Sequence, residues 1–147
     1  YLKYCCKVSI SQVGDQVKMP TAPVVPEKPI YRETKAKVRY AYNYCTHSYT
    51  SAFWGENQWR NELDWLALNG VNVVLDITAQ EEVWRRFLGE IGYTLDEIKA
   101  FIPVPAHYVW FYMANMFDLN GSVHDSCFEE RTHLARRNQL IMRRLDM

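Results

Sequence analysis

The spacing of hydrophobic and polar positions changes several times along the chain, and each spacing predicts a helix, a strand or a turn. Residues 38–44 (VRYAYNY) are rich in aromatic side chains and alternate in polarity, which predicts a β-strand. Residues 71–77 form a nearly continuous apolar run, typical of a parallel strand buried on both faces. Between them, residues 56–69 carry an apolar stripe at helical spacing, so we predict a helix there. The stripe consists of Trp59, Leu63 and Leu66, and Asn69-Gly70 suits the end of the helix.

More helices are predicted after the second strand. One spans residues 80–88 and ends near Gly89, and a helical turn covers residues 107–115. Two capping boxes, each a hydroxyl residue followed three positions later by glutamate, indicate two further helix starts. They are Thr94 with Glu97, which opens a short helix to Phe101, and Ser126 with Glu129, which opens a helix to the chain end with Leu134, Ile141 and Leu145 facing inward.

Residues 1–29 follow a different pattern. Residues 7–19 alternate around Gly14-Asp15, which predicts a small β-hairpin. Prolines then recur at the three-residue period of a polyproline II helix, which predicts an extended strap. They are Pro20, Pro23, Pro26 and Pro29. We interpret the strap as a stiff linker between two domains, and a ligand for a proline-binding module is the alternative.

Strands alternate with helices in the rest of the chain, which favours an α/β fold with parallel strands joined by right-handed crossovers. In such folds the functional site lies beyond the carboxyl ends of the strands. That rule points to residues 43–49 after the first predicted strand and to residues 76–81 after the second.

Composition narrows the class of protein. The chain has 147 residues, and its 17 lysines and arginines balance 17 aspartates and glutamates. This balance gives no electrostatic basis for binding nucleic acid or an anionic membrane, and no apolar run approaches the roughly 20 residues of a membrane-spanning helix. The cysteines lack the spacing of a metal site, so we expect no metal and no cofactor. Aromatic residues, at 14% of the chain, are in excess.

Much of the aromatic excess lies just after the first predicted strand. Sugars present apolar C–H faces surrounded by hydroxyls, so their sites combine aromatic rings with amides, hydroxyls and carboxylates. Position favours Asn43, Cys45 and Tyr49 as such a site. Trp59 and Trp65 are instead interpreted as residues of the helix core.

The acidic and nucleophilic residues are weaker candidates for the functional site than Asn43, Cys45 and Tyr49. Glu81 opens a helix near the presumed site, and we include it among the candidate substrate-binding residues, although a favourable interaction with the helix dipole would also explain it. The dipole suffices for Glu82, and Asp76 is a further candidate near the second strand end. Cys45 with His47 lacks a third orienting group, so covalent cysteine catalysis is not expected.

Two motifs carry a resemblance to a known family. They are Asn43-Tyr44-Cys45-Thr46-His47-Ser48-Tyr49 and the segment WRNELDWLALNGVN at residues 59–72, and Gln80-Glu81, Trp84, and Trp110 with Met113 and Asn115 match as well. With these motifs the sequence resembles the alpha-N-acetylglucosaminidase family of glycoside hydrolases over essentially the whole chain.

The resemblance implies a retaining exo-hydrolase that removes terminal alpha-linked N-acetylglucosamine from glycans. It implies a small N-terminal α/β domain, a (β/α)8-like barrel and a C-terminal helical domain. Residues 1–29 would then be the tail of the first domain with its linker, and residues 30–147 the first, incomplete part of the barrel. It also implies that Asn43, Cys45, Tyr49 and Trp110 line the pocket for the terminal sugar.

Retention needs two carboxylates about 5 Å apart. The resemblance implies that both lie beyond this chain, so no catalytic residue is assigned here. We therefore expect an inactive part of a longer enzyme, with the rest of that enzyme as its partner. Residues 76–79 (DITA) depart from the animal pattern, which favours a bacterial member acting on another glycan.

The resemblance also implies a location outside the cytoplasm. A bacterial member would be secreted, periplasmic or on the cell surface, and an animal member would be lysosomal. Two alternatives stay open: a non-catalytic carbohydrate-binding or interaction module that stands alone, and an unrelated barrel enzyme.

Overall fold

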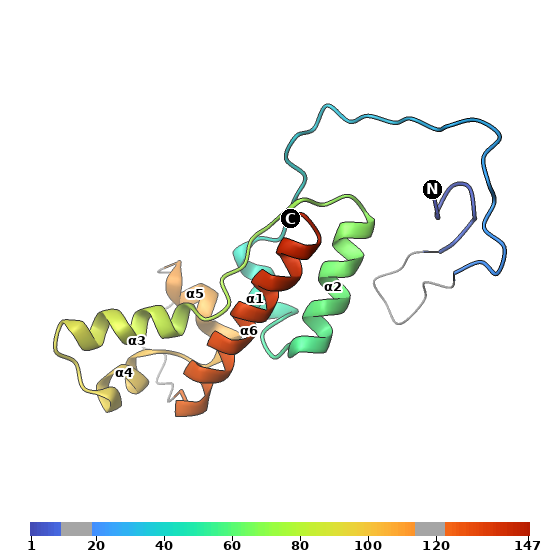
Figure 1. The fold of residues 1–147 in the computed structure, drawn as a ribbon. Helices are drawn as coiled ribbons and strands as arrows, with labels where there is room; N and C mark the ends of the chain where they lie inside the picture. The colour runs from blue at the N-terminus through green and yellow to red at the C-terminus, as the bar shows by residue number, and fades with distance from the viewer. Residues whose placement is uncertain (10–18, 114–122) are drawn as a thin grey trace.

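The computed structural model describes residues 1–9, 19–113 and 123–147. Its helices and strands follow one another as β1 (Tyr40–Ala41), α1 (Tyr44–Tyr49), α2 (Glu56–Leu68), β2 (Val73–Val74), α3 (Gln80–Glu90), α4 (Leu95–Phe101), the 3-10 turn η1 (Pro105–His107), α5 (Tyr108–Tyr112) and α6 (Asp125–Arg144). Figure 1 shows α2 at one end of the helical body, α3 and α4 at the other, and α6 running between them.

The two strands pair in parallel, as the strand–helix–strand order predicts. Tyr40 lies opposite Val73 and Ala41 opposite Val74, and α2 lies between the strands in the chain. Their carboxyl ends therefore meet at one edge. Hydrogen bonds lengthen the pairing slightly, because the Leu75 N–H donates to the Ala41 carbonyl at 3.1 Å.

Both strands are shorter than predicted. The first ends because Tyr42 adopts a left-handed backbone with φ of 78°, after which α1 begins. The second ends at Val74, and the predicted burial on both faces is wrong in this structure because Val73 remains 37% exposed. Its other face would need a further layer to cover it.

Helix α2 agrees closely with the sequence prediction for residues 56–69. Its predicted stripe is buried, with exposed fractions of 2% for Trp59, 1% for Leu63 and 4% for Leu66. Gly70 follows with φ of +84°, a conformation that glycine adopts without strain. The stripe packs toward α6, and Arg137 of α6 bonds Glu56 at the start of α2 with both Nε and Nη2.

A second core joins α3, α4, α5 and the start of α6. It is built from Leu88, Ile98, Ile102, Tyr108, Val123 and Phe128. The predicted capping box that opens α4 is confirmed: the Glu97 N–H donates to Thr94 Oγ1 at 3.4 Å, and the Thr94 N–H donates to the Glu97 carboxylate at 2.8 Å. The predicted helix over residues 80–88 is also present, two residues longer, as α3.

The predicted capping box at Ser126 is wrong. Helix α6 begins at Asp125, and the imidazole of His124 accepts from the Ser126 N–H at 3.2 Å. A histidine at this position replaces the usual hydroxyl cap, and this places Ser126 inside the first turn. Leu134 is buried, as predicted, while Ile141 and Leu145 are half-buried.

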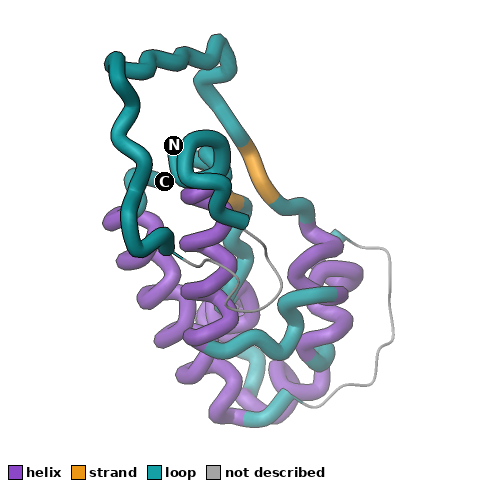
Figure 2. Tube along the Cα trace, turned by 90° about the vertical axis from the view of Figure 1, so that its right-hand side faces the viewer, coloured by secondary structure: helices purple, strands orange, loops and turns teal. Residues whose placement is uncertain are grey.

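The described residues before β1 contain no helix or strand. Residues 19–39, with the four prolines, form a long loop (teal in Figure 2) that arches away from the helices in Figure 1. The predicted hairpin over residues 7–19 lies mostly outside the described residues. The predicted helical turn at residues 107–115 corresponds to α5, and Asn115 is likewise outside the described residues.

Candidate sugar-binding site

The residues of the candidate site follow a strained turn at the end of β1. Tyr42 carries a bulky side chain at positive φ, an uncommon conformation that the surrounding contacts must hold. Its hydroxyl donates to Glu62 Oε1 of α2 at 2.5 Å, and its ring meets Trp59 edge-on with ring centroids 6.2 Å apart. Burial, together with the hydrogen bond to Glu62, raises the pKa of Tyr42 above its ordinary value. The turn directs the chain from β1 into α1.

Helix α1 is fixed by its buried face. His47 is 6% exposed, and its Nε2–H donates to the Leu75 carbonyl at 3.0 Å, just after β2. Since a carbonyl can only accept, this bond fixes the tautomer. Burial lowers the pKa of His47, and the bond to Leu75 opposes the shift. The result is a direct link between the segments that follow the two strands.

The exposed end of α1 brings two predicted site residues together. Tyr49 is 76% exposed, and its ring meets Trp110 of α5 edge-on with centroids 5.1 Å apart and planes 65° apart. We call this pair the aromatic platform. Beneath it, Ser48 accepts a hydrogen bond from the Val109 N–H at 3.3 Å and donates to the Pro105 carbonyl at 3.4 Å. The sequence alone gave no reason to expect these two contacts.

Asn43 and Cys45 belong to the same short helix. The strand predicted over residues 38–44 ends before Asn43, because Asn43 is the N-cap of α1 and Cys45 lies in its first turn. Asn43 is exposed, and its Oδ1 accepts from Thr46. Cys45 is half-buried with a free thiol. Asn43 therefore has a structural role in addition to any contact with a ligand.

Glu81 lies deeper than the predicted pocket. It has no exposed surface, and its Oε1 accepts from Arg131 Nε of α6 at 3.0 Å. Burial raises the pKa of the Glu81 carboxyl, and the Arg131 guanidinium opposes the shift. Arg131 also donates to the Ala52 carbonyl at 3.3 Å and lies 5.7 Å over the ring of Tyr108. Glu81 thus supports the loop after α1 and the start of α5 from below.

The remaining sequence candidates have structural explanations. Asp76 accepts from the Thr78 N–H at 2.8 Å within the loop after β2. Trp59 is buried as predicted, and Trp65 is half-buried with its Nε1 enclosed. Within the described ranges, no three His, Cys, Asp or Glu side chains cluster as metal ligands would.

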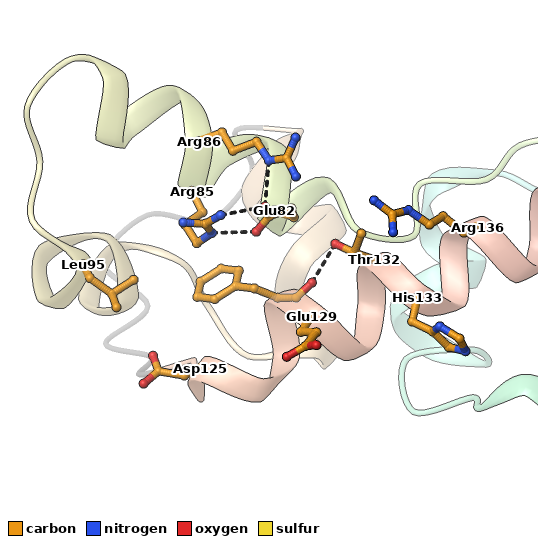
Figure 3. A pocket seen from close by; sticks show the side chains of 10 residues that line it. Glu82, Arg85, Arg86, Leu95, Asp125, Glu129, Thr132, His133 and Arg136 are labelled. Carbon is orange, nitrogen blue, oxygen red and sulfur yellow. Dashed lines mark hydrogen bonds and ion pairs between the residues drawn. The ribbon is translucent and has the colours of Figure 1, made fainter.

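A groove of about 480 Å³ lies elsewhere, between α3 and α6 (Figure 3). Its charges largely neutralise one another, because Glu82 bonds Arg85 at 2.6 Å and Arg86 at 2.7 Å. These pairs lower the pKa of Glu82. The Phe128 ring that lines the groove is buried and has the Arg85 guanidinium 5.7 Å over its centroid, so the exposed aromatic platform is the stronger candidate site.

Comparison with known proteins assigns the family. The family described as "Alpha-N-acetylglucosaminidase (NAGLU) tim-barrel domain" matches residues 39–147. The chain belongs to this family. The match contains β1 through α6 and therefore every residue of the aromatic platform and its supports.

Relatives agree with this assignment. The chain is 33% identical over 138 residues to human alpha-N-acetylglucosaminidase, covering 93% of this chain and 18% of the human protein. It is 43% identical to a family 89 glycoside hydrolase from Clostridium perfringens solved with 2-acetamido-1,2-dideoxynojirmycin, with a TM-score of 0.93 over 100% of this chain and 17% of that one. A variant of the Clostridium perfringens enzyme, solved with its substrate GlcNAc-alpha-1,4-galactose, is 43% identical with a TM-score of 0.88, covering 97% of this chain and 16% of that one.

The chain thus spans less than a fifth of the length of the relatives it matches. Across the described ranges, no helix is long and apolar enough to cross a membrane.

Proposed function

We propose that this chain forms part of a retaining exo-acting alpha-N-acetylglucosaminidase and supplies one wall of the pocket for the terminal sugar. The observation that supports this most directly is the aromatic platform, in which Tyr49, on the helix that follows the carboxyl end of β1, meets Trp110. Barrel enzymes bind their substrates at that end. A Clostridium perfringens relative has been solved with GlcNAc-alpha-1,4-galactose as its substrate, which supports the choice of sugar.

Each proposed pocket residue has a distinct role. The faces of Tyr49 and Trp110 suit the apolar C–H face of an N-acetylglucosamine ring. Asn43 uses its Oδ1 for the helix cap, so its NH₂ group is the part that donates to a sugar hydroxyl. Cys45, half-buried beside them, packs beneath the sugar and performs no nucleophilic attack.

The catalytic carboxylates are proposed to come from outside this chain. The glutamates that face its interior have structural partners: Glu81 pairs with Arg131, Glu82 with Arg85 and Arg86, and Glu62 accepts from Tyr42. We assign residues 30–147 to the first part of a (β/α)8-type barrel and residues 1–29 to the tail of a small α/β domain with its linker. The exposed face of Val73 fits such a barrel, whose later units would cover it.

The proposed setting is extracytoplasmic: secreted, periplasmic or on the cell surface in a bacterium, lysosomal in an animal. The partners are a glycan ending in alpha-linked N-acetylglucosamine and the remainder of the enzyme. The groove in Figure 3 mixes the carboxylates of Glu82, Asp125 and Glu129 with the guanidinium groups of Arg85, Arg86 and Arg136, so it forms no purely basic patch for nucleic acid.

The test is hydrolysis of 4-nitrophenyl alpha-N-acetylglucosaminide by the complete protein that contains this chain, followed by NMR of the sugar product. We expect the alpha anomer to form first, which shows retention, and we expect no turnover by the 147-residue chain alone. A complete protein that binds N-acetylglucosamine without cleaving the substrate would favour the carbohydrate-binding module instead.

A further inference from the structure

We propose that Ser48 is a positioning residue: its hydroxyl caps α5 from α1 and thereby holds Trp110 against Tyr49. This role depends on the proposed function, because it matters to a substrate only if the aromatic platform binds the sugar.

The start of α5 needs a cap that its own segment does not supply. The first N–H groups of a helix have no acceptor within the helix. His107 precedes α5 and makes no side-chain capping bond. The Val109 N–H instead donates to Ser48 Oγ at 3.3 Å, and Val109 has no exposed surface through which water could replace that acceptor. The cap of α5 therefore comes from another helix.

The same hydroxyl also reaches the turn before α5. Ser48 donates to the Pro105 carbonyl in η1 at 3.4 Å and is only 5% exposed. One buried oxygen thus joins α1 to two points of the segment that carries Trp110. A hydroxyl can do this because it both donates and accepts, which an aliphatic side chain of that size cannot.

The hydrogen bond between Ser48 and Val109 affects the positions of the two rings, because each ring belongs to the next residue in the chain. Tyr49 directly follows Ser48, and Trp110 directly follows Val109. Adjacent helical side chains point about 100° apart, and accordingly the Ser48 and Val109 side chains are buried while Tyr49 is exposed and Trp110 half-buried. Ser48 itself does not reach the exposed side where a sugar would lie. It acts through the separation of the two rings, 5.1 Å between centroids.

Ser51 provides a matched control. It is 3% exposed, and its hydroxyl donates to the Thr46 carbonyl at 3.3 Å, so it is a buried serine with one bond of similar length in the same segment. That bond closes the end of α1 and does not reach α5. Loss of the Ser51 hydroxyl removes one buried hydrogen bond and loss of the Ser48 hydroxyl removes two, but only Ser48→Ala releases the platform.

The experiment compares Ser48→Ala and Ser51→Ala in the complete protein. We expect Ser48→Ala to raise the KM for 4-nitrophenyl alpha-N-acetylglucosaminide and the Kd for 2-acetamido-1,2-dideoxynojirmycin about tenfold, with kcat changed less than about twofold. Ser51→Ala should leave both constants within about twofold of wild type at a similar loss of Tm. Equal changes in the two variants would overturn the positioning role.

Hydrogen exchange at the Val109 amide provides a second readout that does not depend on activity. Ser48→Ala should accelerate exchange there, and Ser51→Ala should not. Ser48→Cys keeps the size and a weak acceptor, so we expect intermediate exchange and KM, and it replaces Ser48→Ala should that variant not fold. A wild-type protein that neither binds nor cleaves these compounds refutes the proposed function, whereas unchanged Val109 exchange in Ser48→Ala refutes the cap.

Discussion

Asn43 accepts two hydrogen bonds from Thr46, one from its backbone N–H and one from its Oγ1, each at 3.1 Å. The amide oxygen thus begins α1, the helix that carries Cys45 and Tyr49. An alanine at this position would remove the cap together with any contact to a sugar. Substitution by alanine therefore cannot separate a ligand contact from a folding effect.

Asn43→Asp separates the two roles. An aspartate oxygen still caps the helix, but a carboxylate cannot donate a hydrogen bond. We expect Asn43→Asp to keep the wild-type Tm and to lower kcat/KM by a factor corresponding to about 1–3 kcal/mol. Asn43→Ala should show the same loss of kcat/KM and in addition about 1 kcal/mol lower stability. Wild-type kcat/KM in Asn43→Asp would show that the amide does not touch the sugar.

The buried pair of Glu81 and Arg131 should behave as one unit. Removing one partner leaves the other charge buried, which typically costs about 3–5 kcal/mol. We expect Glu81→Leu and Arg131→Met each to lower the free energy of unfolding by that order, and the double variant to lose clearly less than the sum. Urea unfolding of the four proteins measures this cycle. Additive losses would mean that the 3.0 Å contact contributes no coupling.

His47 predicts how stability changes with pH. Burial lowers its folded pKa below the ordinary value of 6.5, so above that value neither the folded nor the unfolded state binds a proton there. As pH falls below 6.5 the unfolded state gains the proton first, and the contribution of His47 to stability decreases until the folded pKa is passed. We expect the Tm of wild type to fall further than that of His47→Gln between about pH 7.5 and 5.5. Parallel Tm curves would contradict this.

The long, strongly patterned parts of the fold were predictable from sequence. The stripe of Trp59, Leu63 and Leu66 defined α2 and its buried face, and the pair of Thr94 and Glu97 defined the start of α4. The strands were harder. The alternation after Val38 continues through Tyr42, and nothing in it shows that Tyr42 turns left-handed, because Glu62 and Trp59 of α2 hold that turn.

The residues proposed for the site could be chosen from the sequence, but their geometry could not. Position after a strand selected Tyr49, and resemblance added Trp110, 61 positions later, which no local pattern links to it. The contact between them depends on Ser48 and the turn at Pro105, a tertiary arrangement. Glu81 illustrates the opposite case: its place at a helix start suggested a ligand contact or an interaction with the helix dipole, whereas its partner Arg131 lies 50 positions away on α6.

Affinity of the complete protein for 2-acetamido-1,2-dideoxynojirmycin, measured by calorimetry in a Trp110→Ala variant, shows whether the sugar lies on the aromatic platform. Phe87→Ala is the control, since Phe87 is an aromatic residue of α3 that is 52% exposed and outside the platform. We expect Trp110→Ala to weaken binding at least about tenfold, because a stacked ring loses its apolar partner, and Phe87→Ala to bind as wild type. Wild-type affinity in a folded Trp110→Ala protein would show that the sugar does not lie on this platform.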